Sequence, residues 1–363
     1  MDRNHATAQI KLANASFFIT FKIIYVLKSM ITAYDENKKL INLFEVNPDE
    51  LKGQYFCPAC RSRVLLRNGK IKVPHFAHQS LQDCQSWSEN ESQQHLSLKI
   101  ELYEWFSKTE KCQIEHYLAE LEQTPDLLVN DKIAVEIQCS RLSISRLKER
   151  TENYQKHGYT VIWLMGKDLW LKENISNLQK QLTYFSWNSG FYYWELDVTK
   201  GKIRLKSLIH QDIRGKIISV TEEFDFGKGD LLEILRRPFA KQKMKIIKKP
   251  KERGIEDYIQ QQLFHKNPKW MKLQEKYYKK GENLLTAKIK GQSFISPLGL
   301  NLLDQANFSS FIQMNEKGNQ LIKNYYDNFA KANYNTLYPP VFYDKMRDKK
   351  TEETSDGKRK KSD

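Results

Sequence analysis

The sequence predicts an α/β (α+β) protein with a mixed central sheet, a small β-rich N-terminal module and a largely helical C-terminal region. Three observations support this class. Residues 30–88 contain short alternating stretches separated by turn pairs, residues 89–170 follow the order helix, three strands, helix, strand, and residues 255–345 carry apolar residues at helical spacing. A chain of 363 residues accommodates two or three such units.

We divide the chain where its composition changes. The expected units are an upstream extension (1–29), a β-rich module (30–88), a core (89–170), a mixed extension (171–240), a basic linker (241–254), a helical region (255–345) and a disordered polar tail (346–363). Residues 15–27 are apolar apart from Thr20, Lys22 and a few small residues, well short of the roughly 20 apolar residues that a spanning helix needs. We therefore expect Met30 to be the natural start, and no membrane anchor.

The formal net charge of +15 and the cysteine count limit the possible partners and compartment. A positive excess favours a polyanionic partner, although an ordinary soluble basic surface also produces one. A membrane-surface role would need a basic amphipathic helix, and none is clear. The odd number of cysteines, 5, argues against a secreted disulfide framework and favours a reducing compartment.

A metal-binding pattern lies within the β-rich module. Its donor side chains flank a hairpin whose turn is Asn68-Gly69, the preferred pair for such a turn. The expected ligands are Cys57, Cys60, His78 and Cys84, with His75 as the competing histidine. Two cysteines separated by two residues place their thiolates at a spacing that suits tetrahedral zinc, and a closed Cys₃His shell is structural, not catalytic. The alternative is three buried free thiols.

Residues 90–107 are predicted to form a helix with one polar stripe. Glu91, His95 and Lys99 recur every four residues, and the remaining positions supply apolar surface. Such a stripe is either a solvated face or a row of functional groups that points towards the following sheet.

The chemistry is expected at residues 124–138. Residues 127–129 and 133–138 are predicted strands joined by an Asn-Asp turn, so Asp126 should lie opposite Val135 or Glu136. Glu136 and Gln138 share a face because side chains alternate along a strand. Paired carboxylates suit Mg²⁺ or Mn²⁺, which activate water and bind phosphate oxygens. The alternative is a hairpin with a polar face and no metal.

Two further regions carry basic or aromatic groups that suit nucleic acid. On the helix predicted at 143–157, Arg146, Arg150 and Tyr154 either contact a DNA backbone or belong to a solvated basic face. Residues 241–253 are dense in lysine and either hold phosphates or form a flexible linker. The aromatic residues of the C-terminal helices either pack a core or stack on bases.

The pattern Pro125-Asp126, a short gap and then Glu136-x-Gln138 resembles the PD-(D/E)xK nucleases, which have the restriction-endonuclease-like fold. The resemblance implies that Asp126 and Glu136 hold Mg²⁺ or Mn²⁺, with help from Glu91, or alternatively Glu101, on the preceding helix. Gln138 departs from the family, which usually has lysine there. It can orient a water but carries no charge. Either Gln138 suffices, as in variants of the family, or Lys99 replaces that charge. His95 and Lys99 would meet the scissile phosphate.

The ordered motifs of the first half also resemble those of the CoiA-like competence proteins of transformable Gram-positive bacteria. The match runs from Met30 to about residue 170 and includes the cysteine and histidine motifs, Asp126 and the Glu136-Ile137-Gln138 segment. It implies a cytoplasmic protein that processes incoming DNA, single-stranded or branched, during transformation and recombination, together with recombination proteins. The rival prediction is a catalytically inactive DNA-binding accessory factor that assists recombinase loading.

Overall fold

The computed structural model describes residues 29–69, 73–78, 92–250, 254–285, 295–300, 311–331 and 334–344. The predictions for Cys84, for Glu91 and for the polar tail lie outside the described residues, as does the proposed extension apart from Ser29.

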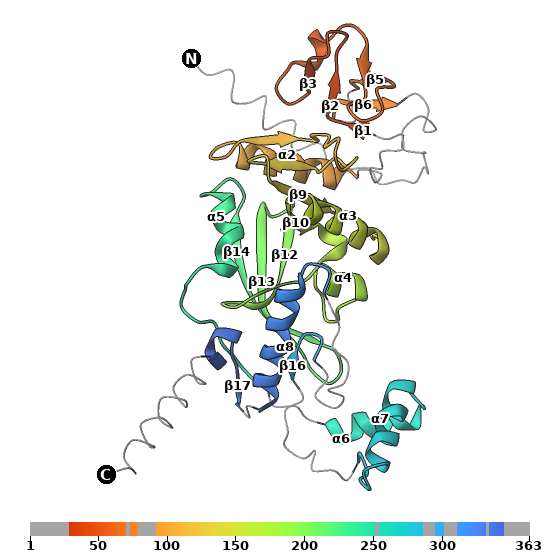
Figure 1. Cartoon of the computed structure of the whole chain (residues 1–363), viewed down its shortest axis with the longest axis vertical. Coiled ribbons are helices and arrows are strands. Elements are labelled where there is room, and N and C mark those ends of the chain that lie inside the picture. Colours follow the sequence, from red (N-terminus) through yellow and green to blue (C-terminus); the bar gives the residue numbers. More distant parts are fainter. Residues whose placement is uncertain are drawn as a thin grey trace, which may run out of the picture.

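An antiparallel sheet forms the N-terminal module, at the top of Figure 1. Its strands, among the described residues, lie in the order β1 (Ser29–Met30), β6 (His75–His78), β5 (Arg63–Arg67), β4 (Tyr55–Phe56), β2 (Thr32–Tyr34) and β3 (Leu40–Asn42), with the short helix η2 (Pro48–Glu50) after β3. The predicted hairpin is β5–β6, which pairs Val64 with His78 and Leu66 with Phe76. Val64 and Phe76 are buried, and the module packs on the rest of the protein partly through the rings of Phe44 and Tyr103.

A mixed sheet forms the centre of the molecule (Figure 1). Among the described residues its main path is β14 (Ile217–Asp225), β13 (Lys202–Gln211), β12 (Gly190–Asp197), β10 (Thr160–Met165), β9 (Ile133–Gln138), β8 (Leu127–Val129) and β7 (Cys112–Ile114). The short strands β11 (Tyr184–Ser186) and β16 (Ser296–Pro297) pair with β12 and β13. β10 runs parallel to both β9 and β12, whereas the other pairs are antiparallel. The sheet therefore continues past residue 170, where we expected a unit to end.

Two helices flank the part of the sheet that carries the predicted chemistry. The first, α2 (Gln93–Phe106), begins at Ser92, whose hydroxyl accepts a hydrogen bond from the His95 amide, and it contacts β7, β8 and β9. The second, α3 (Ile144–Lys156), is capped in the same way by Ser143 and provides the crossover between the parallel strands β9 and β10. The first strand after α2 is the short β7 (Cys112–Ile114), and beyond it Leu118 forms an isolated bridge with Gln123.

Further helices complete the structure. The bounds of the shorter ones are η4 (Lys167–Leu169), α4 (Asn177–Gln181), α5 (Leu231–Arg236) and η5 (Arg237–Phe239). The C-terminal helices are α6 (Ile255–Phe264), α7 (Pro268–Tyr278) and α8 (Glu316–Lys331). The predicted linker 241–254 contributes β15 (Ile247–Lys248), which pairs with β17 (Thr336–Leu337). These elements confirm the α+β class.

The C-terminal helices pack on two separate cores. On α8, Tyr325 lies against Phe185 and its hydroxyl is 3.3 Å from His210 Nε2, so this helix covers the central sheet. Helices α6 and α7 form a smaller core with Ile259, Trp270 and Leu273. Most of the aromatic side chains thus pack in interiors. In the part of the chain that the structure describes, no helix combines the length and the apolar character needed to cross a bilayer.

Candidate active site and metal-binding group

The β8–β9 hairpin places Asp126 opposite Glu136. The register pairs Leu127 with Val135, so the next pair outwards is Asp126 with Glu136, one of the two predicted arrangements. The turn uses Asn130 and Asp131 at φ +50° and +56°, a left-handed conformation that these residue types tolerate better than most. The two carboxylates therefore meet where the hairpin opens.

Asp126 is held by groups from both the sheet and α2. Its Oδ2 accepts a hydrogen bond from the Ile137 amide at 2.8 Å and lies 3.0 Å from His95 Nε2. Its Oδ1 is 3.1 Å from Lys99 Nζ. Burial alone would raise the pKa of the Asp126 carboxyl, but His95, Lys99 and the Ile137 amide together hold that pKa well below its usual range. The Asp126 carboxylate is therefore ionised at neutral pH.

Lys99 is almost completely buried, with 1% of its side chain exposed, and a second carboxylate compensates its charge. Glu115 Oε1 lies 2.8 Å from Lys99 Nζ. The other oxygen of Glu115 accepts hydrogen bonds from the backbone amides of Ile31 at 2.6 Å and Thr32 at 3.2 Å. Glu115 thus connects the N-terminal module directly to the cation that binds Asp126.

Replacing Glu115 by glutamine is expected to lower the free energy of unfolding by about 2 kcal/mol, because a hydrogen-bonded buried ion pair with Lys99 is lost. Urea unfolding measures the change. Glu104→Gln, at an exposed position on α2, provides the matched control and should leave stability within about 0.5 kcal/mol of the original. Equal stability of the two variants would contradict the prediction.

Glu136 is bound by two side chains of α3. Arg150 forms an ion pair with Glu136 Oε1, and the Tyr154 hydroxyl donates to the same oxygen at 2.7 Å. Burial raises the pKa of Glu136, and Asp126 raises it further, whereas Arg150 and Tyr154 oppose the rise. Arg150 also lies 3.5 Å from the Thr124 carbonyl. The structure therefore places Arg150 and Tyr154 in the interior against a site carboxylate, and their contact with DNA stays a prediction.

The remaining predicted site residues occupy different positions. Gln138 is buried at the end of β9, and its amide nitrogen donates to the Ser140 carbonyl at 3.1 Å. Arg146 is half-buried and forms an ion pair with the exposed Glu149 at 3.1 Å. Glu101, the alternative to Glu91, is exposed on α2. The structure thus brings together Asp126, Glu136, His95 and Lys99. Arg146 pairs with Glu149 within α3, and Glu101 is exposed.

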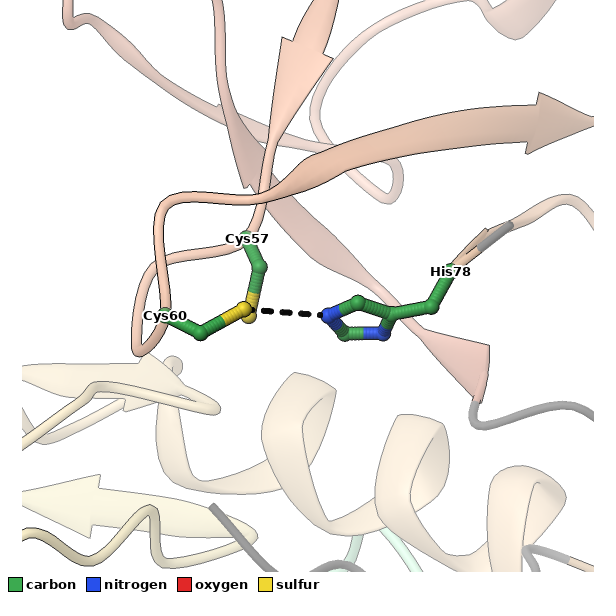
Figure 2. Close-up of side chains that lie close together, drawn as sticks. All are labelled: Cys57, Cys60 and His78. Carbon is green, nitrogen blue, oxygen red and sulfur yellow. Dashed lines mark hydrogen bonds between the residues drawn. The ribbon is translucent and has the colours of Figure 1, made fainter. Parts of the chain in front are cut away.

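A cysteine and histidine cluster lies in the N-terminal module. Cys57, Cys60 and His78 converge so that their ligand atoms all lie within 4.8 Å of one another, and Cys60 Sγ is 3.3 Å from His78 Nε2 (Figure 2). His75 points elsewhere, because its Nδ1 is 2.9 Å from the Val73 carbonyl. Soft thiolates and one imidazole suit Zn²⁺. Three of the four predicted ligands therefore form one group, with His78 as the histidine.

The local fold explains this convergence. Cys57 follows β4, and its amide donates to the Ser62 carbonyl while its carbonyl accepts from the Arg61 amide at 3.0 Å. Arg61 adopts φ +63°, which closes the loop and directs Cys60 back towards Cys57. The strand that follows this loop is β5, and its residue Val64 pairs with His78 on β6. The pairing brings His78 to the loop that carries the two cysteines.

Family comparisons match both parts of this architecture. The model of the N-terminal domain of competence protein CoiA matches residues 45–87, and the model of its nuclease-like domain matches residues 91–235. The chain belongs to the CoiA-like family. Competence protein CoiA of Bacillus subtilis (strain 168) is 34% identical over 139 residues, which are 37% of this chain and 36% of that relative. The alignment thus spans about a third of the curated relative. None of the solved structures matches this one significantly.

The CoiA nuclease-like domain model, residues 91–235, includes the described part of the site as well as strands β12 to β14. The match therefore extends past residue 170, as the continuous sheet does. The CoiA N-terminal domain model contains the Cys57, Cys60 and His78 group.

Sequence reasoning missed Glu115 as part of this CoiA-like site. No spacing pattern singles it out, because it is an isolated acid directly after a short strand. Its importance comes from partners that are 16 and more than 80 residues distant in the chain. A buried lysine on the polar stripe of α2 implies a second acidic partner, and that is the signal that points to such a residue.

Proposed function

We propose that this protein is a metal-dependent DNA nuclease that processes incoming DNA during competence. The observation that supports the proposal most is the pairing of Asp126 and Glu136 at the open end of the β8–β9 hairpin, with Lys99 and His95 at Asp126. Two carboxylates beside a lysine cation suit the metal-assisted hydrolysis of a phosphodiester.

Asp126 and Glu136 would hold Mg²⁺ or Mn²⁺, because hard carboxylate oxygens are the ligands that these ions prefer. A bound ion would lower the pKa of a water and neutralise charge on the phosphate. The low pKa of Asp126 keeps this ligand ionised. Gln138, on the same face as Glu136, would orient the attacking water through its amide.

Lys99 would supply the positive charge that Gln138 lacks. Its Nζ already lies 3.1 Å from Asp126, so a phosphate that approaches the carboxylate pair also approaches this cation. Glu115 fixes Lys99 from the other side at 2.8 Å and prevents it from turning away. His95, whose Nε2 lies 3.0 Å from Asp126, would donate a hydrogen bond to a phosphate oxygen as the substrate binds.

The N-terminal group would bind Zn²⁺ as a structural ion. Cys57, Cys60 and His78 supply three donors, and Cys84 is the fourth ligand proposed from the sequence. A closed shell leaves no position for a substrate, so zinc would stabilise the module and not take part in cleavage.

The relative's name, a competence protein, supports a role with DNA in transformation. The net charge of +15 also favours a polyanionic substrate. We assign to this chain a cytoplasmic location, DNA in single-stranded or branched form, and recombination proteins as partners.

A second candidate is an accessory factor that binds DNA without cutting it. It is favoured by Gln138 and by the pairing of each carboxylate with a protein cation, Lys99 for Asp126 and Arg150 for Glu136. These pairs neutralise the charge that would otherwise attract a metal ion. The candidate predicts DNA binding that is independent of Mg²⁺ and Mn²⁺.

One assay separates the two functions. Protein that retains its zinc is incubated with end-labelled single-stranded, duplex and branched DNA, with added Mg²⁺, with added Mn²⁺ or with neither. Cleavage that requires the added ion supports the nuclease and identifies its DNA form. Binding without cleavage under all three conditions overturns the nuclease and favours the accessory factor.

A further inference from the structure

A large cleft lies far along the chain from Asp126 and Glu136. Its volume is about 1170 Å³, and it is lined by α4, α6, α7, β16 and the turn between β13 and β14. Small-molecule sites usually measure roughly 300–1,000 Å³, so this cleft is large enough for part of a polymer. No predicted catalytic or zinc-binding residue lines it.

One wall of the cleft is a basic face of α7. Lys269, Lys272 and Lys276 line the cleft and recur at i, i+3 and i+7, which places them in one row along the helix. Trp270 and Leu273 of the same helix are buried in the small core with α6, and they also border the cleft. The helix therefore packs through these apolar side chains, and its exposed lysines line the cleft.

The other wall is also basic. Lys180 comes from α4, and Arg214 comes from the turn between β13 and β14. Burial lowers the pKa of Lys180, and the nearby charge of Lys269 lowers it further. The two walls therefore repel one another across the cleft, an arrangement that an anion between them would relieve.

The acidic side chains at the cleft are occupied locally. Asp212 Oδ1 accepts hydrogen bonds from the amides of Arg214 and Lys216 within its own turn. Glu275 lies 2.7 Å from Lys279, one turn further along α7. The half-buried Tyr258 lines the cleft as well, with the Arg214 guanidinium 5.2 Å from its ring centroid.

We propose that this cleft binds single-stranded nucleic acid, with the two basic walls holding the phosphates and Tyr258 contributing an aromatic surface. Basic grooves that also contain aromatic side chains are typical of single-strand binding sites. The inference rests on the proposed function only in taking DNA as the ligand. It assigns a strand-holding role to the region around α6 and α7, separate from the carboxylate site.

The test measures binding and not cleavage, so its outcome is independent of whether the protein is a nuclease. The full-length protein is titrated into a fluorescein-labelled oligothymidine strand and into a labelled duplex of equal length, with no added Mg²⁺ or Mn²⁺, at several salt concentrations. The cleft variant is Lys269→Gln with Lys272→Gln. The matched control is Lys317→Gln with Lys323→Gln, which removes two exposed lysines from α8.

The cleft variant is expected to bind the single strand about tenfold more weakly at moderate salt. The plot of log K, where K is the association constant, against the logarithm of the salt concentration should have a slope that is less negative by about 1.4. This corresponds to about 0.7 for each of two lost phosphate contacts. Lys180→Gln on the opposite wall should act in the same direction, and the control should bind as the original protein does. Unchanged affinity and slope in the cleft variant, equal losses in the control, or equal losses for the duplex would overturn the proposal.

Discussion

Replacing Asp126 by asparagine, or Glu136 by glutamine, is expected to lower metal-dependent DNA cleavage by on the order of 10³-fold or more. Each change removes one negative charge from the proposed metal ligands and keeps the shape of the side chain. The asparagine oxygen can still accept the Ile137 amide, and glutamine can still accept from Arg150 and Tyr154. The loss is thus expected in cleavage, with DNA binding unchanged.

The choice of amides matters because both carboxylates are paired inside the protein. An alanine at position 136 would leave Arg150 buried without its carboxylate, at a cost of about 3–5 kcal/mol. An inactive Glu136→Ala protein would therefore not distinguish lost chemistry from lost structure. A thermal unfolding measurement on Asp126→Asn and Glu136→Gln checks that both variants are folded.

Asp131→Asn is the matched control for Asp126→Asn. Asp131 lies in the turn of the same hairpin, 56% exposed, and asparagine is well suited to its left-handed backbone. The rates are measured on end-labelled DNA with Mg²⁺ or Mn²⁺. If Asp126→Asn and Asp131→Asn cleave DNA equally well, the carboxylate pair is not the catalytic site.

The carboxylate pair was predictable from sequence because the signals that define it are local. The Asn-Asp turn sets the hairpin, and the period of two along a strand places Glu136 and Gln138 on one face. The helical repeat of four similarly brought His95 and Lys99 to the same side of α2, and both lie at Asp126. The approximate positions of α2 and α3 were also predicted, and in the structure a serine caps the start of each helix.

Long-range contacts were not predictable in this way. The pattern of Arg150 and Tyr154 on α3 is equally compatible with a solvated face, and only the packing of α3 on the sheet shows that they bind Glu136. The extent of the sheet was also missed. The pairing of β12 with β10 joins residues far beyond the crossover helix, and strand order depends on tertiary packing that periodicity does not encode.

Removing the proposed zinc is expected to unfold the N-terminal module. Structural zinc sites contribute about 10–16 kcal/mol in small zinc-binding peptides, and the short strands of this module offer little else to replace it. Cys57→Ser should reduce bound zinc to background and increase proteolysis of the module. Cys112→Ser is the control, since Cys112 lies on β7 outside the cluster and burial raises the pKa of its thiol to about 12. Wild-type zinc content in Cys57→Ser would contradict the assignment.

Unfolding of the module should also disturb the site formed by Asp126 and Glu136, because Glu115 contacts both the module and Lys99. When the amides of Ile31 and Thr32 no longer bind Glu115, this carboxylate loses its fixed position, and Lys99 loses the partner that fixes it beside Asp126. Hydrogen exchange at Ile31 and Thr32 should increase in Cys57→Ser. DNA cleavage should fall by about 10–100-fold, the usual effect of removing a group that orients a metal ligand. Glu115→Gln should show a similar loss of cleavage while retaining zinc, which would place the coupling at this side chain and not at the metal. If Cys57→Ser loses zinc and still cleaves DNA at the original rate, the module acts independently of the site.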